Sequence, residues 1–221
     1  MIRDTSLQPG WLPCLGVFLL TACLSTDLGG DLARAYPTQT LSPCTARANF
    51  GDPADSPYVL PFPVGKSYWV SQSYCEPEGS HQNQLAYDFQ MPVGVDITAA
   101  RAGRVVEIRE DTPDICDWEY YNLHNYVMIE HEDHSTAFYA HLKQHSVLVE
   151  IGDWVDQGQL IAKSGNSGFT GYRPHLHFGV YRTYPVVEGD DIAVNFSNGA
   201  GPLDDRGGLI QWRYYEALPY Q

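Results

Sequence analysis

The chain has 221 residues, of which 43% are hydrophobic, enough for one globular domain with a sizeable core plus extensions at the termini. Its 13 lysines and arginines stand against 27 aspartates and glutamates, a formal net charge of −14, and no basic stripe occurs, which excludes nucleic acid as an expected partner. Fifteen tyrosines, twenty glycines and fifteen prolines, with no long stretch of helical period, predict an all-β, mainly antiparallel protein of short strands and turns.

The N-terminal residues 1–23 are predicted to be a signal peptide. The apolar segment WLPCLGVFLLTAC, residues 11–23, is too short to span a bilayer comfortably and is typical of a secretory signal. Its end, LTAC, resembles the lipobox of bacterial lipoproteins, in which the cysteine, here Cys23, is lipidated and becomes the new N-terminus. We expect a lipoprotein anchored in the cell envelope, and the alternative is a soluble secreted or periplasmic protein cleaved after Ala35.

Export places the three remaining cysteines in an oxidising compartment. Cys44, Cys75 and Cys116 lack the CxxC spacing of a structural zinc site, so one disulfide and one free thiol are expected. We predict pairing of Cys75 with Cys116, while pairing of Cys44 with either of them stays open.

The rest of the chain divides by composition. Residues 24–60 are rich in Gly, Pro, Asp, Ser and Thr, which predicts a disordered tether or loosely packed lead-in. A β-domain is expected over 61–183, followed by a C-terminal extension, 184–221, that packs back on it. Strand patterns within the domain occur at 95–110, at 125–142 as a hairpin around an EDHS turn, at 149–165 and at 174–180.

Two stretches of this domain carry candidate metal ligands. GSHQNQLAYDFQMPVG, residues 79–94, places His81 after a Gly-Ser turn and Asp88 inside an apolar strand. PHLHFGV, residues 174–180, places His175 and His177 on one face of a strand, roughly 7 Å apart. His81, Asp88 and one histidine of the strand pair would supply two nitrogens and one oxygen, a set that suits zinc and leaves its fourth position open.

Four other histidines are expected to have no part in a metal site. His131 and His134 form HEDH, whose spacing is one residue short of the helical HExxH motif and whose acidic residues suit a solvated turn. His124 and His145 lie beside predicted loops, and we expect both at the surface.

Several motifs together resemble the lysostaphin-type zinc endopeptidases, the LytM or peptidase M23 family: GSHQNQLAYDFQMPVG, AARAGRVV, YAHL at 139–142, GDWVDQGQLIAKSGNSG and PHLHF. The resemblance covers about residues 60–183. It implies that His81, Asp88 and His177 bind Zn²⁺ and that His141 and His175 are the two unliganded catalytic histidines. All five positions are filled, which favours an active enzyme over relatives that have lost ligands. The sequence departs from the family in its His-to-Asp gap of six residues and in the FTGYR loop, which lacks a glycine before proline.

The resemblance also implies a fold and a substrate. The fold would be a small open β-sheet or β-sandwich domain of the duplicated hybrid motif type, with zinc in a groove between loops. Separately, we expect a monomer. The substrate would be the peptide cross-links of bacterial peptidoglycan. We assign His175 as general base and His141 as a donor to the oxyanion or an aid to proton transfer, roles that the two could exchange. For Tyr139, core packing is favoured over a role as a donor.

Two other functions remain open at this stage. One is a catalytically silent module of the same fold that binds the wall or activates a hydrolase, but its signature, a broken ligand set, is absent. The other starts from GDWVDQGQ, which is similar to the hairpin of biotinyl and lipoyl carrier domains. Lys163 is the nearby lysine, yet the residues around it do not match a carrier site.

Overall fold

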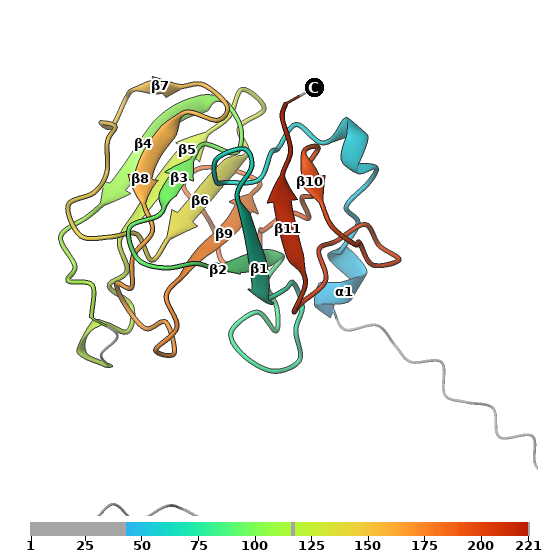
Figure 1. The fold of residues 1–221 in the computed structure, drawn as a ribbon, viewed down its shortest axis with the longest axis horizontal. Helices are drawn as coiled ribbons and strands as arrows, with labels where there is room; N and C mark the ends of the chain where they lie inside the picture. Colours follow the sequence, from blue (N-terminus) through green and yellow to red (C-terminus); the bar gives the residue numbers. More distant parts are fainter. Residues whose placement is uncertain (1–42, 116–117, 221) are drawn as a thin grey trace, which may run out of the picture. The chain divides into compact units, whose positions relative to one another are not determined.

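The computed structural model describes residues 43–115 and 118–220, and this part of the chain is built on β-strands (Figure 1). Two sheets contain all of them. The strands of the larger sheet are β1 (Ser67–Gln72), β2 (Ala86–Gln90), β4 (Gly103–Arg109), β5 (Tyr126–Glu130), β6 (Thr136–Ala140), β7 (Trp154–Val155), β9 (His175–Tyr181), β10 (Gly199–Ala200) and β11 (Tyr214–Ala217). The smaller sheet pairs β3 (Asp96–Thr98) with β8 (Leu160–Lys163).

The larger sheet has nine strands in the order β10-β11-β1-β2-β9-β6-β5-β4-β7, and every pairing in it is antiparallel. The helices are short: α1 (Pro43–Arg47) and the 3₁₀ turns η1 (Pro53–Asp55) and η2 (Trp118–Tyr120). In the described ranges, none of these helices has the length or apolarity to cross a bilayer. Because the strands pair antiparallel throughout and the helices are short, the predicted all-β, mainly antiparallel fold is confirmed.

The core lies on one face of the larger sheet, where the β3–β8 sheet covers it. Because side chains alternate along a strand, Val70, Phe89 and Phe178 point to this face and are fully buried. Ile97 of β3 and Ile161 of β8 belong to the same apolar cluster. The opposite face of β2, β9 and β6 is left for the polar and aromatic side chains described below.

The described part of the predicted lead-in, residues 43–60, is packed into the domain. Cys44 and Leu60 are 0% exposed and lie in the core cluster. Arg47 at the end of α1 forms an ion pair with Asp191 at 3.0 Å and donates to the carbonyl oxygen of Asn83 at 2.7 Å. The prediction of a loosely packed lead-in is wrong for these residues. Their buried apolar side chains are isolated along the chain, so the sequence shows no periodicity that would predict the packing. The predicted signal peptide, residues 1–23, with Cys23, and the alternative cleavage site at Ala35 lie outside the described residues.

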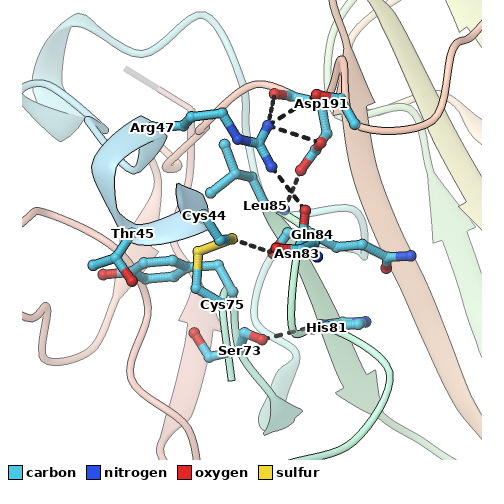
Figure 2. Close-up of a disulfide and its surroundings, with 12 residues drawn as sticks. Cys44, Thr45, Arg47, Ser73, Cys75, His81, Asn83, Gln84, Leu85 and Asp191 are labelled. Atoms are coloured by element: carbon cyan, nitrogen blue, oxygen red, sulfur yellow. Dashed lines mark hydrogen bonds and ion pairs between the residues drawn. A yellow bond between two sulfur atoms is a disulfide. The ribbon is translucent and has the colours of Figure 1, made fainter. Parts of the chain in front are cut away.

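A disulfide joins Cys44 of α1 to Cys75, which follows β1 (Figure 2). The predicted Cys75–Cys116 pairing is wrong, and Cys116 lies outside the described residues. The Cα atoms of Cys44 and Cys75 are 5.6 Å apart because α1 packs beside the loop that leads from β1 to β2. This pairing depends on where the lead-in docks, which the spacing of cysteines does not reveal.

The C-terminal segment adds an edge to the sheet. Strand β11 pairs with β1, with Tyr215 opposite Tyr68 and Tyr214 opposite Trp69. The ring of Tyr215 is fully buried, and its hydroxyl donates to the carbonyl oxygen of Pro202 at 2.6 Å. Tyr214 points to the opposite face and is exposed.

Candidate metal centre and its flanking histidines

Two central strands of the larger sheet bring the candidate ligands together. In the pairing of β2 with β9, Asp88 lies opposite His177 and Gln90 lies opposite His175. Directly paired residues of antiparallel strands point to the same face, so all four side chains share the face away from the core. The predicted common face of His175 and His177 follows from this register.

His81 reaches the same place from the loop between β1 and β2. Its ring is fully buried, and its Nδ1 donates to the carbonyl oxygen of Ser73 at 3.0 Å (Figure 2). The Nε2 atom therefore faces the cluster, 3.3 Å from Oδ1 of Asp88 and 3.2 Å from Nδ1 of His177. Oδ1 of Asp88 and Nδ1 of His177 are 2.9 Å apart. The ligand atoms of His81, Asp88 and His177 all lie within 4.8 Å of one another.

This donor set fits a zinc ion. Two imidazole nitrogens and one carboxylate oxygen are the ligands of known catalytic zinc sites, and three protein ligands leave a position for water or substrate. The hydrogen bond from His81 to Ser73 fixes the ring orientation and tautomer that a metal ligand needs. Within residues 43–115 and 118–220, this is the only group of three such side chains with converging ligand atoms.

The electrostatics of Asp88 and His177 favour the forms that bind a metal. Burial opposes a charge on His81, but Asp88 beside it raises the pKa of that imidazole. Burial acts against the charge on Asp88, but His81 and His175, with hydrogen bonds from His177 and His81, hold the pKa of its carboxyl well below the usual range. Burial lowers the pKa of His177, although the neighbouring Asp88 opposes the effect. A carboxylate and a neutral imidazole are the states in which both residues can donate electron pairs.

Two further histidines flank the cluster. His141 follows β6 with a left-handed backbone, φ +60°, and its Nδ1 donates to the carbonyl oxygen of Ser167 at 2.8 Å. Nδ1 of His175 donates to the carbonyl oxygen of Arg173 at 2.7 Å, and its Nε2 lies 3.6 Å from Oδ2 of Asp88. The ring centroids of His141 and His175 are 4.6 Å apart. All five predicted site residues are thus brought together.

Burial and the nearby His175 lower the pKa of His141 well below its usual value. His141 is therefore neutral near pH 7, with its one proton on Nδ1 and a lone pair on Nε2. In His175 the hydrogen bond of Nδ1 to Arg173 likewise leaves Nε2 turned toward Asp88.

His124 is a neighbour of the site that sequence reasoning missed. Its ring packs 5.4 Å from the ring of His141 and edge-to-face on Phe138, and burial, followed by the nearby His177, lowers its pKa to about 4. His124 is half-buried and not fully at the surface as expected, because its ring packs against Phe138 and His141. In the sequence, the position of His124 directly before the strand YVMIE is the one signal that it could lie near the site.

The remaining histidines have structural or surface positions. The predicted hairpin is present as β5 and β6, and His134 in its turn is exposed. Glu132 and Asp133 are exposed, as expected for a solvated turn, whereas His131 is 3% exposed and its Nδ1 donates to the carbonyl oxygen of Ala102 at 2.9 Å. His145 is exposed, as expected. Tyr139 is fully buried and its hydroxyl accepts from the amide of Ala100, in agreement with the predicted core packing.

Lys163 forms an ion pair with Asp96 across β3 and β8. Its side chain is thus engaged on the small sheet, which leaves the carrier-domain interpretation without support.

Comparison with known proteins gives a consistent result. Residues 82–194 match peptidase family M23, a segment that contains Asp88, His141, His175 and His177 and begins directly after His81. An uncharacterized metalloprotease of Buchnera aphidicola is 31% identical over 143 residues, which are 61% of this chain and 34% of that protein.

Two relatives have more specific names. Lysostaphin of Staphylococcus simulans is 34% identical over 92 residues, 41% of this chain and 16% of lysostaphin. The peptidoglycan DD-endopeptidase ShyB of Vibrio cholerae is 32% identical over 133 residues, 57% of this chain and 28% of that enzyme. The chain thus spans about a third or less of the length of these relatives.

Proposed function

The chain belongs to peptidase family M23, and from this premise we propose that it is a zinc-dependent endopeptidase that hydrolyses the peptide cross-links of bacterial peptidoglycan. The observation that carries the proposal is the convergence of His81, Asp88 and His177 on one point, with His141 and His175 beside it. Relatives named as a peptidoglycan DD-endopeptidase and as a glycyl-glycine endopeptidase support the substrate class.

In this proposal His81, Asp88 and His177 hold the zinc ion. When bound, zinc supplies Lewis acidity: it lowers the pKa of a water that it holds to roughly 7 and polarises the scissile carbonyl. The buried carboxylate of Asp88 would offset part of the metal's charge.

In this proposal His175 and His141 transfer the protons of the reaction. Nε2 of neutral His175 accepts a proton from the attacking water, and the charged form is stabilised by Oδ2 of Asp88, 3.6 Å away. Nε2 of His141, oriented by the hydrogen bond to Ser167, can accept a proton and deliver it to the leaving amine. The roles of the two rings could be exchanged.

We place the protein outside the cytosol, in the cell envelope. The Cys44–Cys75 disulfide supports this location because such crosslinks persist in oxidising compartments. Lipidation of Cys23 would tether the enzyme, as a monomer, to the membrane and direct it to the cell's own wall, because anchoring restricts it to nearby substrate. Recovery of the mature protein wholly in the soluble fraction, without an acyl group by mass spectrometry, would contradict the anchor.

The deciding experiment is digestion of purified peptidoglycan by the zinc-loaded protein, with products identified by mass spectrometry. We expect cleaved cross-links, whose masses identify the bond, and no cleavage by the His177→Ala variant. Exposed His145 offers a matched histidine control, and His145→Ala should cleave as the parent does. Intact wall after incubation with folded, zinc-bearing protein would contradict the proposal and favour the silent wall-binding or activating module.

A further inference from the structure

Three aromatic side chains, from β1, the turn before β11 and the start of β11, form a patch that we call the aromatic platform: half-buried Trp69 and the exposed Trp212 and Tyr214. The ring centroids of Trp69 and Trp212 are 5.0 Å apart, and those of Trp69 and Tyr214 are 6.4 Å apart with nearly parallel planes, 25° between them. Trp212 is 48% and Tyr214 is 66% exposed. Contiguous exposed rings of this kind mark interaction surfaces more often than isolated ones do.

The platform lies on the same face of the sheet as the metal centre. Tyr214 pairs with Trp69, Trp69 pairs with Gln90, and Gln90 pairs with His175, so one row of side chains crosses four neighbouring strands. On the opposite face, the pairs Tyr68–Tyr215 and Val70–Phe89 point to the core. With about 4.8 Å between strands, Tyr214 lies roughly 14 Å and Trp69 roughly 10 Å from His175 along the row.

Trp212 is held in this patch at an energetic cost. Its φ of +62° lies in the left-handed region, which a residue with a bulky side chain rarely adopts. The amide of Trp212 donates to the carbonyl oxygen of Val70 at 2.8 Å, which fixes the residue against β1. Backbone conformations of this kind are energetically unfavourable and are often found at functional sites.

We propose that the aromatic platform binds the glycan strand of peptidoglycan while the attached stem peptide reaches the metal centre. The inference rests on the proposed function and adds the saccharide as a second recognised part of the substrate. The faces of pyranose rings present C–H groups, which stack on the negative faces of aromatic rings. Strand β11 lies beside β1, with only the two-residue β10 beyond it at this end of the sheet (Figure 1).

Polar groups beside the platform suit the substituents of a sugar. Trp212 also lines a cavity of about 430 Å³ with Glu76 and Gln211 among its walls. These side chains offer acceptors and donors for hydroxyl and acetamido groups. A chain with a net charge of −14 is unsuited to a polyanionic ligand, whereas sugar stacking needs no positive charge.

The spacing matches a substrate made of sugar and peptide. An extended peptide spans about 3.3–3.6 Å per residue, so the roughly 14 Å between Tyr214 and His175 corresponds to about four residues. A stem peptide of this length would leave its sugar on the platform when a bond at its far end lies at the metal centre. Binding energy gained at the platform would then help to position the scissile bond.

The first test measures binding of the zinc-loaded protein to glycan strands freed of peptide by an amidase. We expect the Trp212→Ala and Tyr214→Ala variants each to bind roughly tenfold more weakly, while Tyr214→Phe retains binding and Tyr214→Leu does not. Trp154 is the matched control, since it is 49% exposed and lies on β7 at the opposite edge of the sheet. Equal binding by the parent, Trp212→Ala and Trp154→Ala would overturn the proposal.

The second test separates this inference from the proposed function. On cross-linked wall fragments that retain sugars, the platform variants should raise KM several-fold with little change in kcat; on sugar-free cross-linked peptides they should match the parent. A protein that cleaves neither substrate but binds peptide-free glycan would refute only the proposed endopeptidase. Equal losses on both substrates, or a dimer in solution that Trp212→Ala dissociates without affecting glycan binding, would refute the platform.

Discussion

The carbonyl oxygen of Ser167 accepts a hydrogen bond from Nδ1 of His141 at 2.8 Å, so a loop residue orients a histidine that follows a different strand. The hydroxyl of Ser167 accepts from the amide of Asn125 at 2.9 Å and donates to the carbonyl oxygen of Leu142 at 2.8 Å. This buried hydroxyl therefore fixes the position of its own carbonyl group and, through it, of the catalytic candidate.

We predict that Ser167→Ala lowers kcat more than it raises KM. The variant leaves the buried amide of Asn125 unpaired, which should also cost about 1–3 kcal/mol of unfolding free energy. Denaturant titration and steady-state kinetics on cross-linked peptides measure the two effects. Ser164→Ala is the control, because Ser164 is equally buried but its hydroxyl bonds the backbone of Val95 and Pro92 and does not orient the ring of His141. Equal kcat losses in both variants would contradict an orienting role.

Removal of zinc should lower the melting temperature of the parent protein. A ligand that binds only the folded state stabilises it by about 2.7 kcal/mol at a hundred times its Kd. In the His81→Ala variant the cluster retains only Asp88 and His177, so the melting temperature should no longer respond to zinc or chelator. Calorimetry with and without a chelator measures the difference. A full zinc response in His81→Ala would show that the metal binds elsewhere.

Loss of the disulfide should weaken both the fold and the metal centre. Cys44 and Cys75 are 31 residues apart in sequence, and a crosslink of that span contributes about 2–4 kcal/mol. The amide of Cys75 also donates to the carbonyl oxygen of Gln84 at 3.0 Å, which closes the loop that carries His81. We expect the Cys44→Ser, Cys75→Ser double variant to unfold at lower denaturant concentration and to lose zinc faster to a competing chelator. If the variant released zinc at the same rate as the oxidised parent, the disulfide would stabilise the fold without affecting the metal centre.

Acid should destabilise the protein partly through His131. Burial lowers the pKa of its imidazole to about 4, so the unfolded chain binds more protons between pH about 6.5 and pH about 4. Above pH 6.5 His131 is neutral in both states and its burial does not lower the free energy of unfolding. As the pH falls from about 6.5 to about 4, the free energy of unfolding declines by up to about 3 kcal/mol. Chemical denaturation at several pH values should show a shallower acid loss in His131→Gln. Exposed His134 is the control, and equal slopes in His131→Gln and His134→Gln would contradict the prediction.

Local rules predicted much of the site. The two-residue period of a strand places His175 and His177 on one face, and an aspartate inside the apolar strand AYDFQM needs a partner that the fold supplies. The EDHS turn between two β-patterned segments predicted the hairpin of β5 and β6. These features depend on a few neighbouring residues and are therefore visible in the sequence.

Contacts between distant segments were the part that sequence could not supply. His124 and His131 are covered by elements far from them in the chain, and nothing in their immediate neighbours shows it. The choice of Cys44 over Cys116 as the partner of Cys75 depends on where α1 docks. The aromatic platform likewise arises from the register between β1 and β11, which are more than 140 residues apart.

Asp88 and His177 lie on β2 and β9, two interior strands, each held by a neighbour on either side. The edges of the sheet, β10 with β11 at one end and β7 at the other, have no such role in fixing the ligands. Insertions, deletions and exchanges at those edges can therefore accumulate without displacing the metal ligands. Changes at the edges can therefore alter what binds there while the strands that carry the metal ligands keep their positions.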